Sequence, residues 1–325
     1  MPTLAFLGGA HIHTPGFIGN LKDREGFSCK WFYDHDLARA EKRASELGAQ
    51  ATDDLNAVLS DPEVDAVIVC SETDRHEALV LPTVRAGKHL FVEKPLGCGA
   101  KDARSMAEAI ENAGLIYQTG YFSRGNPAIL KVKELVEAGT FGKITRVRGS
   151  NCHSGALGHW FDTEWRWMAD PKIAGGGAFG DLGTHYLDVL LWIFGDVTSV
   201  TGQVDAGTDI YDGCDETGEA LLRFKSGAIG TLAAAWDDVA NPVSLLVSGT
   251  EGHATIIDGK LRLKTKDFDG PVEDLPEAKP AGLTSFLDAL EGKPAELVTA
   301  SEAARRSEVM AAIYEGAANG TWVSP

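Results

Sequence analysis

The chain has 325 residues, of which 44% are hydrophobic and 24% charged, and its formal net charge at pH 7 is −17. This length suits two domains rather than one, and the near-average composition argues against disorder. The sequence lacks the roughly 20-residue apolar stretch that spans a bilayer, and its negative charge disfavours nucleic acid as a partner.

The five cysteines are widely spaced and include no Cys-x-x-Cys pair: Cys29, Cys70, Cys98, Cys152 and Cys214. This usage argues against a disulfide framework or a thiolate metal site and fits a reducing compartment. The first residues, MPTLAFLGG, lack a basic region and resemble a strand, so we expect no secretory signal. We therefore expect a cytoplasmic protein.

The first third of the chain alternates short apolar runs with helical patterns. The runs expected as strands are residues 3–8, 28–34, 64–70, 89–92 and 115–120. Helical patterns cover residues 37–47, 79–86 and 103–113. This alternation is typical of βαβ units and predicts a doubly wound parallel sheet of the Rossmann type.

The first strand leads into the sequence LGGAHIH, residues 7–13, at the place where a Rossmann domain binds pyrophosphate. Gly8 matches the first glycine of G-x-G-x-x-G, whereas Ala10 and His13 replace the other two. The pattern alone fits an ordinary tight turn equally well. Its position in the first βαβ unit favours a cofactor site that includes Gly8, Ala10, His11 and His13.

Asp34 closes the second expected strand, where an acid can bind the adenosine ribose hydroxyls. An acid there would repel a 2′-phosphate, so we expect NAD as the cofactor. His35 follows directly and could weaken that preference, which leaves NADP possible. The alternative role for Asp34 is a helix N-cap.

The pattern changes after residue 142. Strands are expected at residues 143–151, 197–205, 218–224, 228–236, 244–248 and 253–257, with helices at 182–194, 283–290 and 303–318. Strands without intervening helices predict a largely antiparallel open sheet with helices on one face. We expect a NAD(P)-binding domain over residues 1–121 and a substrate-binding and oligomerisation domain over 122–325, the last helix packing back on the first. The uncovered sheet face predicts a homodimer or homotetramer.

Two segments carry a family resemblance: FVEKPLG at residues 91–97 and GGGAFGDLGTHYLD at 175–188. Together they resemble the Gfo/Idh/MocA oxidoreductases, which show an E-K-P tripeptide after a Rossmann strand and a G-G-G…D-x-G-x-H-x-x-D helix. The resemblance extends over nearly the whole chain and departs from the family at His11-x-His13. It implies an NAD(P)-dependent oxidoreductase acting on CH–OH groups, with further contacts from Ser71, His76 and Glu93 to the cofactor and from Tyr121 and Arg124 to the cleft.

The resemblance also implies catalysis by Lys94, Asp181 and His185, and simple chemistry agrees. Oxidation of a carbinol needs a base for the hydroxyl proton, and a histidine titrates near neutral pH. Asp181 precedes His185 by four residues, one helical turn, and could orient it. Lys94 follows a parallel strand, where its ammonium could stabilise an alkoxide. The alternatives are a surface lysine and a structural helix histidine.

Residues 151–167, NCHSGALGHWFDTEWRW, combine tryptophans with polar side chains. Aromatic faces beside hydrogen-bonding groups suit a carbohydrate, so we expect His153, Trp160, Trp165 and Arg166 to face the substrate. The alternative is a loop that covers the core or contacts another subunit. A metal held by His11 and His13 with His153 or His159 is disfavoured because the pattern is not compact, and we expect no metal.

These observations predict a dehydrogenase or reductase that moves a hydride to or from a hydroxyl or keto carbon of a sugar, cyclitol or glycoside. Two alternatives stay open. One is an NAD-dependent glycosidase or lyase that oxidises its substrate transiently, and the other is a non-catalytic nucleotide-dependent sensor. The partner is in each case a small carbohydrate-like molecule.

Overall fold

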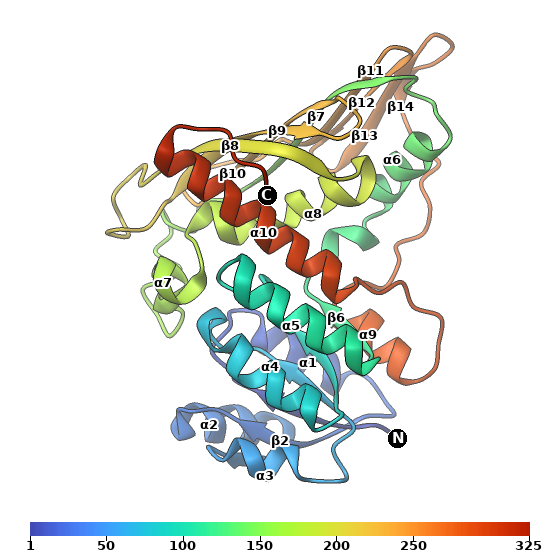
Figure 1. The fold of residues 1–325 in the computed structure, drawn as a ribbon. Helices are drawn as coiled ribbons and strands as arrows, with labels where there is room; N and C mark the ends of the chain where they lie inside the picture. Colours follow the sequence, from blue (N-terminus) through green and yellow to red (C-terminus); the bar gives the residue numbers. More distant parts are fainter.

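The computed structural model describes residues 1–325 and shows two layered domains, one above the other in Figure 1. None of the helices is both long and apolar enough to span a bilayer. The chain enters through the lower domain, builds the upper one, and ends with a long helix that lies against both.

The first domain is a parallel sheet of order β3-β2-β1-β4-β5-β6. Its strands are β1 (Thr3–Leu7), β2 (Ser28–Tyr33), β3 (Gln50–Thr52), β4 (Ala66–Val69), β5 (His89–Val92) and β6 (Tyr117–Thr119). The helices between them are α1 (Thr14–Lys22), α2 (Leu37–Leu47), α3 (Leu55–Leu59), α4 (His76–Arg85) and α5 (Ala100–Ala113). Strand β4 is buried at every residue, as a parallel strand covered on both faces must be. The predicted Rossmann sheet is confirmed.

The second domain is an eight-stranded sheet of order β14-β13-β12-β11-β7-β10-β9-β8. Its strands are β7 (Ile144–Cys152), β8 (Val197–Asp205), β9 (Thr217–Phe224), β10 (Ile229–Ala235), β11 (Val243–Gly249), β12 (Gly252–Ile257), β13 (Lys260–Thr265) and β14 (Asp269–Pro271). Only the β7–β10 pair is parallel, so the predicted largely antiparallel sheet is confirmed.

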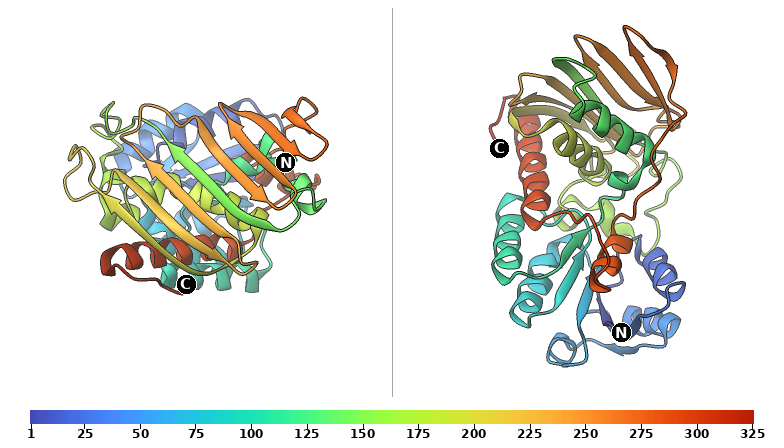
Figure 2. Two further views of the ribbon diagram at one scale, coloured as in Figure 1. Left: turned by 90° about the horizontal axis from the view of Figure 1, so that it is seen from above. Right: turned by 90° about the vertical axis from the view of Figure 1, so that its right-hand side faces the viewer.

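The remaining helices are α6 (Pro127–Glu137), α7 (Pro171–Ala174), α8 (Ala178–Phe194), α9 (Leu283–Leu290) and α10 (Ala300–Asn319). Helix α8 packs on β7 and β10, and α10 packs on β8. The other face of the sheet carries no helix, and in the left view of Figure 2 its strands lie in front of the rest of the molecule.

The chain returns to the first domain near its end. Leu283, Phe286 and Leu287 of α9 are buried in the same core as β1 and α1. The start of α10, through Ala300, Ala303 and Ala304, joins the core under α5. Residue 121 lies just beyond β6. Helices α9 and α10 both contribute buried residues to the cores of the first domain.

Helix α6 and strands β13 and β14 were not anticipated from the sequence. Strand β13 has the sequence KLRLKT, in which only two apolar residues alternate with charged ones. Its composition gives only a weak strand signal, and its antiparallel pairing with β12 makes it a strand of the sheet.

Candidate active site

The turn between β1 and α1 requires a glycine at its first position. Gly8 has a φ of 89°, and a Cβ there would lie 2.6 Å from the Cα of Ser71. Ser71 is itself buried, with its hydroxyl bonded to the Glu72 carbonyl. The ends of β1 and β4 therefore approach closely, which places the loop after β4 beside the turn.

Most amides of the turn already have acceptors inside the protein. The Gly9 N–H donates to Asp34 Oδ2 at 2.8 Å, the His11 N–H to the Cys70 carbonyl, and the His13 N–H to the imidazole Nδ1 of His11. The N–H groups of Ala10 and Ile12 have no such partner. They lie at the N-terminal end of α1, so they can hold the pyrophosphate of a dinucleotide, and the site fits that group.

Asp34 is fully buried at the end of β2. It binds the Arg39 guanidinium with both carboxylate oxygens, at 2.7 and 2.8 Å. The N-cap of α2 is Asp36, whose side chain accepts from Ala38 and Arg39 amides. Capping is therefore not the role of Asp34. His35 is half-exposed beside it, with Nδ1 at 3.2 Å from Oδ1.

The Lys94 ammonium and the Asp181 carboxylate form the centre of the site, with Nζ and Oδ1 2.5 Å apart. The second oxygen of Asp181 accepts from the indole N–H of Trp236 at 3.2 Å. Burial alone would raise the pKa of Asp181, but the Lys94 ammonium outweighs it and lowers that pKa. Asp181 therefore stays ionised at neutral pH and fixes Lys94 in place.

His185 lies one turn further along α8, with its ring near those of Tyr121 and Phe122, at centroid distances of 6.3 and 6.2 Å. It makes no hydrogen bond to Asp181, so the expected orienting contact is absent while the shared helix face is present. Desolvation, together with the Lys94 ammonium, lowers the pKa of His185 from 6.5 to about 3. The imidazole is therefore neutral and able to accept a proton.

His11 and His13 of the turn converge with Glu93, and their candidate ligand atoms lie within 4.8 Å of one another. His13 Nδ1 is bonded to Glu93 Oε1 at 2.9 Å, and His11 Nδ1 accepts the His13 N–H. These bonds use one nitrogen of each imidazole, and neither His153 nor His159 is among the three converging residues. Burial lowers the pKa of His11 to about 3, so this side chain is also neutral.

His76 follows the loop after β4 and is buried. Its Nδ1 lies 3.1 Å from the Leu96 carbonyl, and its Nε2 has no partner in the protein. A buried nitrogen without a partner is costly unless a ligand satisfies it, which agrees with a cofactor contact. The Lys94–Pro95 peptide bond is cis.

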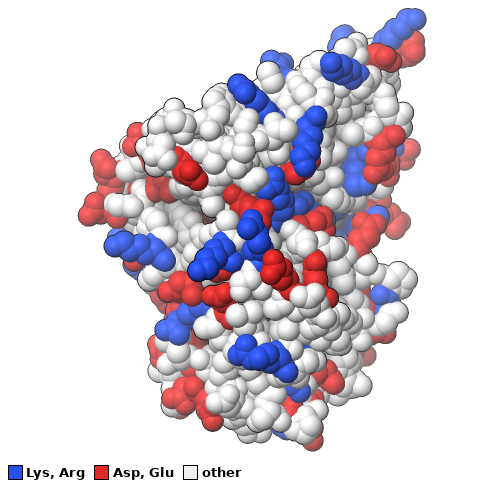
Figure 3. All heavy atoms as spheres, in the orientation of Figure 1, with Lys and Arg blue, Asp and Glu red and all other residues white.

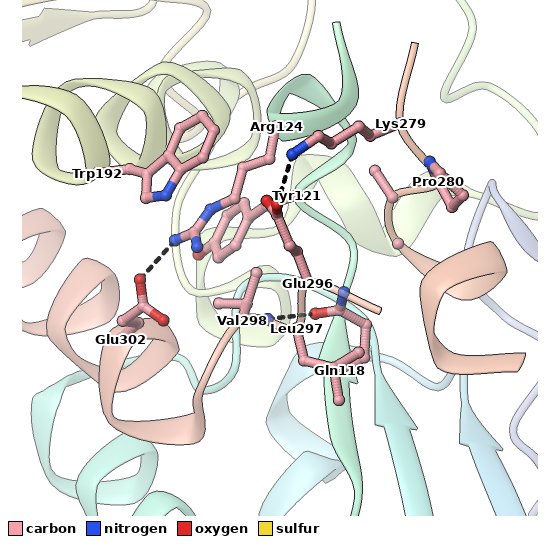
Figure 4. A pocket seen from close by; sticks show the side chains of 12 residues that line it. Gln118, Tyr121, Arg124, Trp192, Lys279, Pro280, Glu296, Leu297, Val298 and Glu302 are labelled. Atoms are coloured by element: carbon pink, nitrogen blue, oxygen red, sulfur yellow. Dashed lines mark hydrogen bonds and ion pairs between the residues drawn. The ribbon is translucent and has the colours of Figure 1, made fainter. Parts of the chain in front are cut away.

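Tyr121 and Arg124 both line a pocket of about 280 Å³ at the domain junction, but their polar groups bind different partners. The Tyr121 hydroxyl is bonded to Thr184, next to His185. The Arg124 guanidinium instead binds the buried Asp188, at 2.8 and 2.6 Å, and Glu302. Figure 4 shows both side chains in this pocket, with Trp192 beside Arg124. Arg124 thus connects α8 to α10 through Asp188 and Glu302.

The four residues of segment 151–167 that were expected to face the substrate do not share one surface. The rings of His153 and Trp160 are in contact at a centroid distance of 4.7 Å and are tilted by 35° to each other, and Trp160 is 45% exposed. Trp165 packs against the core of the second domain. Arg166 lies over the Tyr211 ring and pairs with the exposed Asp162. Only His153 and Trp160 form an aromatic surface.

Residues 153–170, here called the cover segment, reach across to the first domain. Trp167 donates its indole N–H to the Ala10 carbonyl at 3.0 Å. Glu164 pairs with Arg43 and Lys42 of α2, at 3.0 and 3.1 Å. A cavity of about 20 Å³ remains among His11, Lys94, Trp167 and Asp181, room for about one water molecule.

Sequence reasoning missed Trp167, Glu164 and Trp236 as parts of the site. Trp236 ends the expected strand 228–236, and an indole at the end of a strand near a catalytic helix could have suggested a partner for Asp181. For Glu164 the sequence carries no indication, because its partners lie more than a hundred residues earlier in the chain.

Two family models match this chain. Residues 4–121 match "Oxidoreductase family, NAD-binding Rossmann fold", and residues 129–255 match "GFO/IDH/MocA C-terminal domain". Among characterised proteins, the scyllo-inositol 2-dehydrogenase (NAD⁺) of Bacillus subtilis is 30% identical over 68% of this chain and 67% of its own. The levoglucosan dehydrogenase of Pseudarthrobacter phenanthrenivorans is 25% identical over 66% of this chain, and the alignment spans 60% of that protein.

Solved structures show the same fold. A levoglucosan dehydrogenase in complex with NADH superposes with a TM-score of 0.82 at 20% identity, covering 99% of this chain and 98% of that one. An oxidoreductase from Desulfitobacterium hafniense superposes with a TM-score of 0.85 at 20% identity and covers 100% of this chain and 98% of that one.

Proposed function

This chain belongs to the Gfo/Idh/MocA family of oxidoreductases, and we propose that it is an NAD-dependent dehydrogenase or reductase acting on a sugar, cyclitol or glycoside. The observation that carries the proposal is the Lys94–Asp181 ion pair, with His185 on the same helix, beside a turn that can bind pyrophosphate. The inositol and levoglucosan dehydrogenases among its relatives support the substrate class.

His185, Lys94 and Asp181 have different roles in the proposed hydride transfer. When bound, the nicotinamide ring supplies the hydride acceptor or donor. His185 is neutral, so it can take the proton of the substrate hydroxyl as the carbinol carbon is oxidised. The Lys94 ammonium, held by Asp181, stabilises the negative charge that develops on the oxygen. In reduction the same groups act in reverse.

The adjacent His153 and Trp160 rings are the best candidates for a carbohydrate-binding surface. Sugar C–H faces pack on aromatic rings, and the ring nitrogens can bond to hydroxyls. Replacing Trp160 with alanine is expected to raise the Michaelis constant severalfold while NADH binding, measured by fluorescence, stays unchanged. A change in oligomeric state with unaltered kinetics would instead support a subunit contact.

One observation favours a second candidate, a glycosidase or lyase that oxidises and re-reduces its substrate without releasing the cofactor. The cover segment is bonded to the first domain at both Ala10 and α2, and this arrangement would slow cofactor exchange. Such an enzyme turns over without a net change in nicotinamide absorbance.

A screen over sugars, cyclitols and glycosides, with NAD and NADP, separates these functions. We expect nicotinamide absorbance to change with at least one free sugar or cyclitol. Product release from a glycoside without an absorbance change would support the second candidate. No turnover and no nucleotide binding would contradict both.

We further propose a cytoplasmic homodimer or homotetramer that associates through the uncovered sheet face. All five cysteines are free thiols, which suits a reducing compartment. The side chains of Leu221 and Ile229 are 43% and 55% exposed on neighbouring strands of that face. Large apolar side chains gathered on one surface favour association with another subunit.

A further inference from the structure

The loop after β4 brings a second carboxylate to the edge where Asp34 lies. Strands β2 and β4 flank β1, so the loops that follow them lie on either side of the turn that can bind pyrophosphate. Glu72 stands in the loop after β4 and is only 9% exposed. Its Oε1 accepts from Arg39 Nη2 at 2.9 Å.

Arg39 is thus held between two acids. Its Nε and Nη2 bind Asp34, and Nη2 also binds Glu72. An arginine beside the adenosine ribose could otherwise turn to a 2′-phosphate, which guanidinium groups bind well. Here two carboxylates neutralise it and fix its geometry.

The second oxygen of Glu72 has no hydrogen-bond partner. Glu72 Oε2 is buried, and Arg75 Nε lies 3.8 Å from it, beyond hydrogen-bonding distance. A buried carboxylate oxygen without a donor is costly, so this atom has unused capacity to accept a bond. An adenosine offers donors in its ribose hydroxyls and its amino group, whereas a 2′-phosphate offers only negative oxygens.

We propose that Glu72 is a specificity-determining residue that, together with Asp34, selects NAD(H) over NADP(H). Glu72 acts in two ways: it holds Arg39 away from a 2′-phosphate, and it opposes that phosphate with its own charge. This inference rests on the proposed function, because it presupposes that a nicotinamide dinucleotide binds here.

A substitution of Asp34 would not test cofactor selection alone, because the Asp34 carboxylate also accepts the hydrogen bond of the Gly9 N–H in the turn. Glu72→Gln removes the charge and keeps an oxygen for Arg39. Glu72→Ala also removes the hydrogen bond to Arg39 and leaves this guanidinium bound to Asp34 alone. Asp74→Asn is the matched control, since it removes one charge from the same loop at an exposed residue outside the Arg39 network.

The measurement is the dissociation constant of NADH and of NADPH for each purified protein, by fluorescence titration at one fixed ionic strength. We expect the wild type to prefer NADH. The NADPH:NADH affinity ratio should rise about tenfold in Glu72→Gln, the size of one charged contact, and further in Glu72→Ala. Asp74→Asn should leave the ratio within about twofold.

An unchanged ratio in both Glu72 variants, or an equal shift in Asp74→Asn, would overturn the inference and leave the proposed function standing. A wild type that prefers NADPH would also overturn it. A correctly folded wild type that binds neither nucleotide would contradict the proposed function itself.

Discussion

At the scale of single residues, the site consists of charges and imidazoles whose protonation is set by burial and by one another. The opposite charges of Lys94 and Asp181 compensate each other, and the neutral imidazole of His185 lies on the same helix as Asp181. Burial tends to raise the pKa of Glu93, but His11, His13 and Lys94 outweigh it and lower that pKa. The site therefore holds fixed charges beside the neutral imidazoles of His11 and His185 at pH 7.

Removal of the base tests the catalytic assignment. His185→Ala should lower the single-turnover rate of hydride transfer by about 10²–10⁴-fold, because the hydroxyl proton loses its acceptor. Nucleotide binding and the circular dichroism spectrum should be unchanged. Rates close to the wild type in this variant would contradict the mechanism even though the fold is correct.

Lys94→Ala should cause a comparable loss, and the double variant should lose much less than the product of the two, because both groups act on one oxygen. Removing Lys94 leaves the Asp181 carboxylate without its cation, which destabilises the fold. The same substitution combined with Asp181→Asn restores charge balance and serves as the control. Fully multiplicative losses would show that the two residues act independently.

The buried His11 predicts acid sensitivity. The unfolded chain takes up a proton near pH 6.5, whereas folded His11 does so only near pH 3, so the free energy of unfolding falls as pH drops through this window. Between pH 7 and 5 the expected loss from this residue is about 2 kcal/mol. His11→Asn keeps an acceptor for the His13 N–H but does not titrate.

Urea denaturation of both proteins at pH 7 and pH 5 measures this difference. The wild type should lose about 2 kcal/mol more than His11→Asn over that interval. Equal losses would show that His11 is protonated in the folded protein with an ordinary pKa.

At the scale of elements, the cover segment is the feature that joins the domains across the cofactor turn. Its two contacts differ in kind: Trp167 bonds a carbonyl of the turn, and Glu164 pairs with the side chains of α2. If the dinucleotide lies beneath this segment, its release requires both contacts to open.

Weakening these contacts should speed cofactor release. Trp167→Phe removes one hydrogen bond and keeps an aromatic ring, so the NADH dissociation rate should rise about twofold to tenfold. Glu164→Gln should act in the same direction and depend on salt. Asp162→Asn, in the same segment but outside these contacts, should leave the stopped-flow rate unchanged. If all three variants release NADH at the wild-type rate, the segment does not limit exchange.

At the scale of the whole molecule, ion pairs join the domains on one side and leave a sheet face free on the other. Arg104 of α5 pairs with Glu308 of α10, and Arg305 of α10 pairs with Asp196. In Figure 3, acidic and basic side chains are interspersed over the face that contains this junction rather than separated into surfaces of one sign. The uncovered face of the sheet instead exposes the apolar Leu221 and Ile229.

That face should mediate self-association. Leu221→Asp combined with Ile229→Asp places like charges opposite each other in a symmetric contact and should lower the mass measured by light scattering. Leu37→Asp, at an exposed apolar residue of the first domain, is the control and should leave the mass unchanged. If the double variant keeps the wild-type mass, the subunits associate elsewhere or not at all.

The sequence by itself determined the Rossmann sheet, the antiparallel sheet, most helix and strand positions and the family, because apolar periodicity and short motifs are local. It also singled out Lys94, Asp181 and His185, which the fold brings together. Only the tertiary structure decided what each side chain touches. Asp181 binds Lys94 and Trp236 rather than His185, Arg124 binds Asp188, and Trp167 rather than Trp165 reaches the turn. These contacts join distant segments, and the direction of a side chain across a domain junction depends on packing that no local pattern encodes.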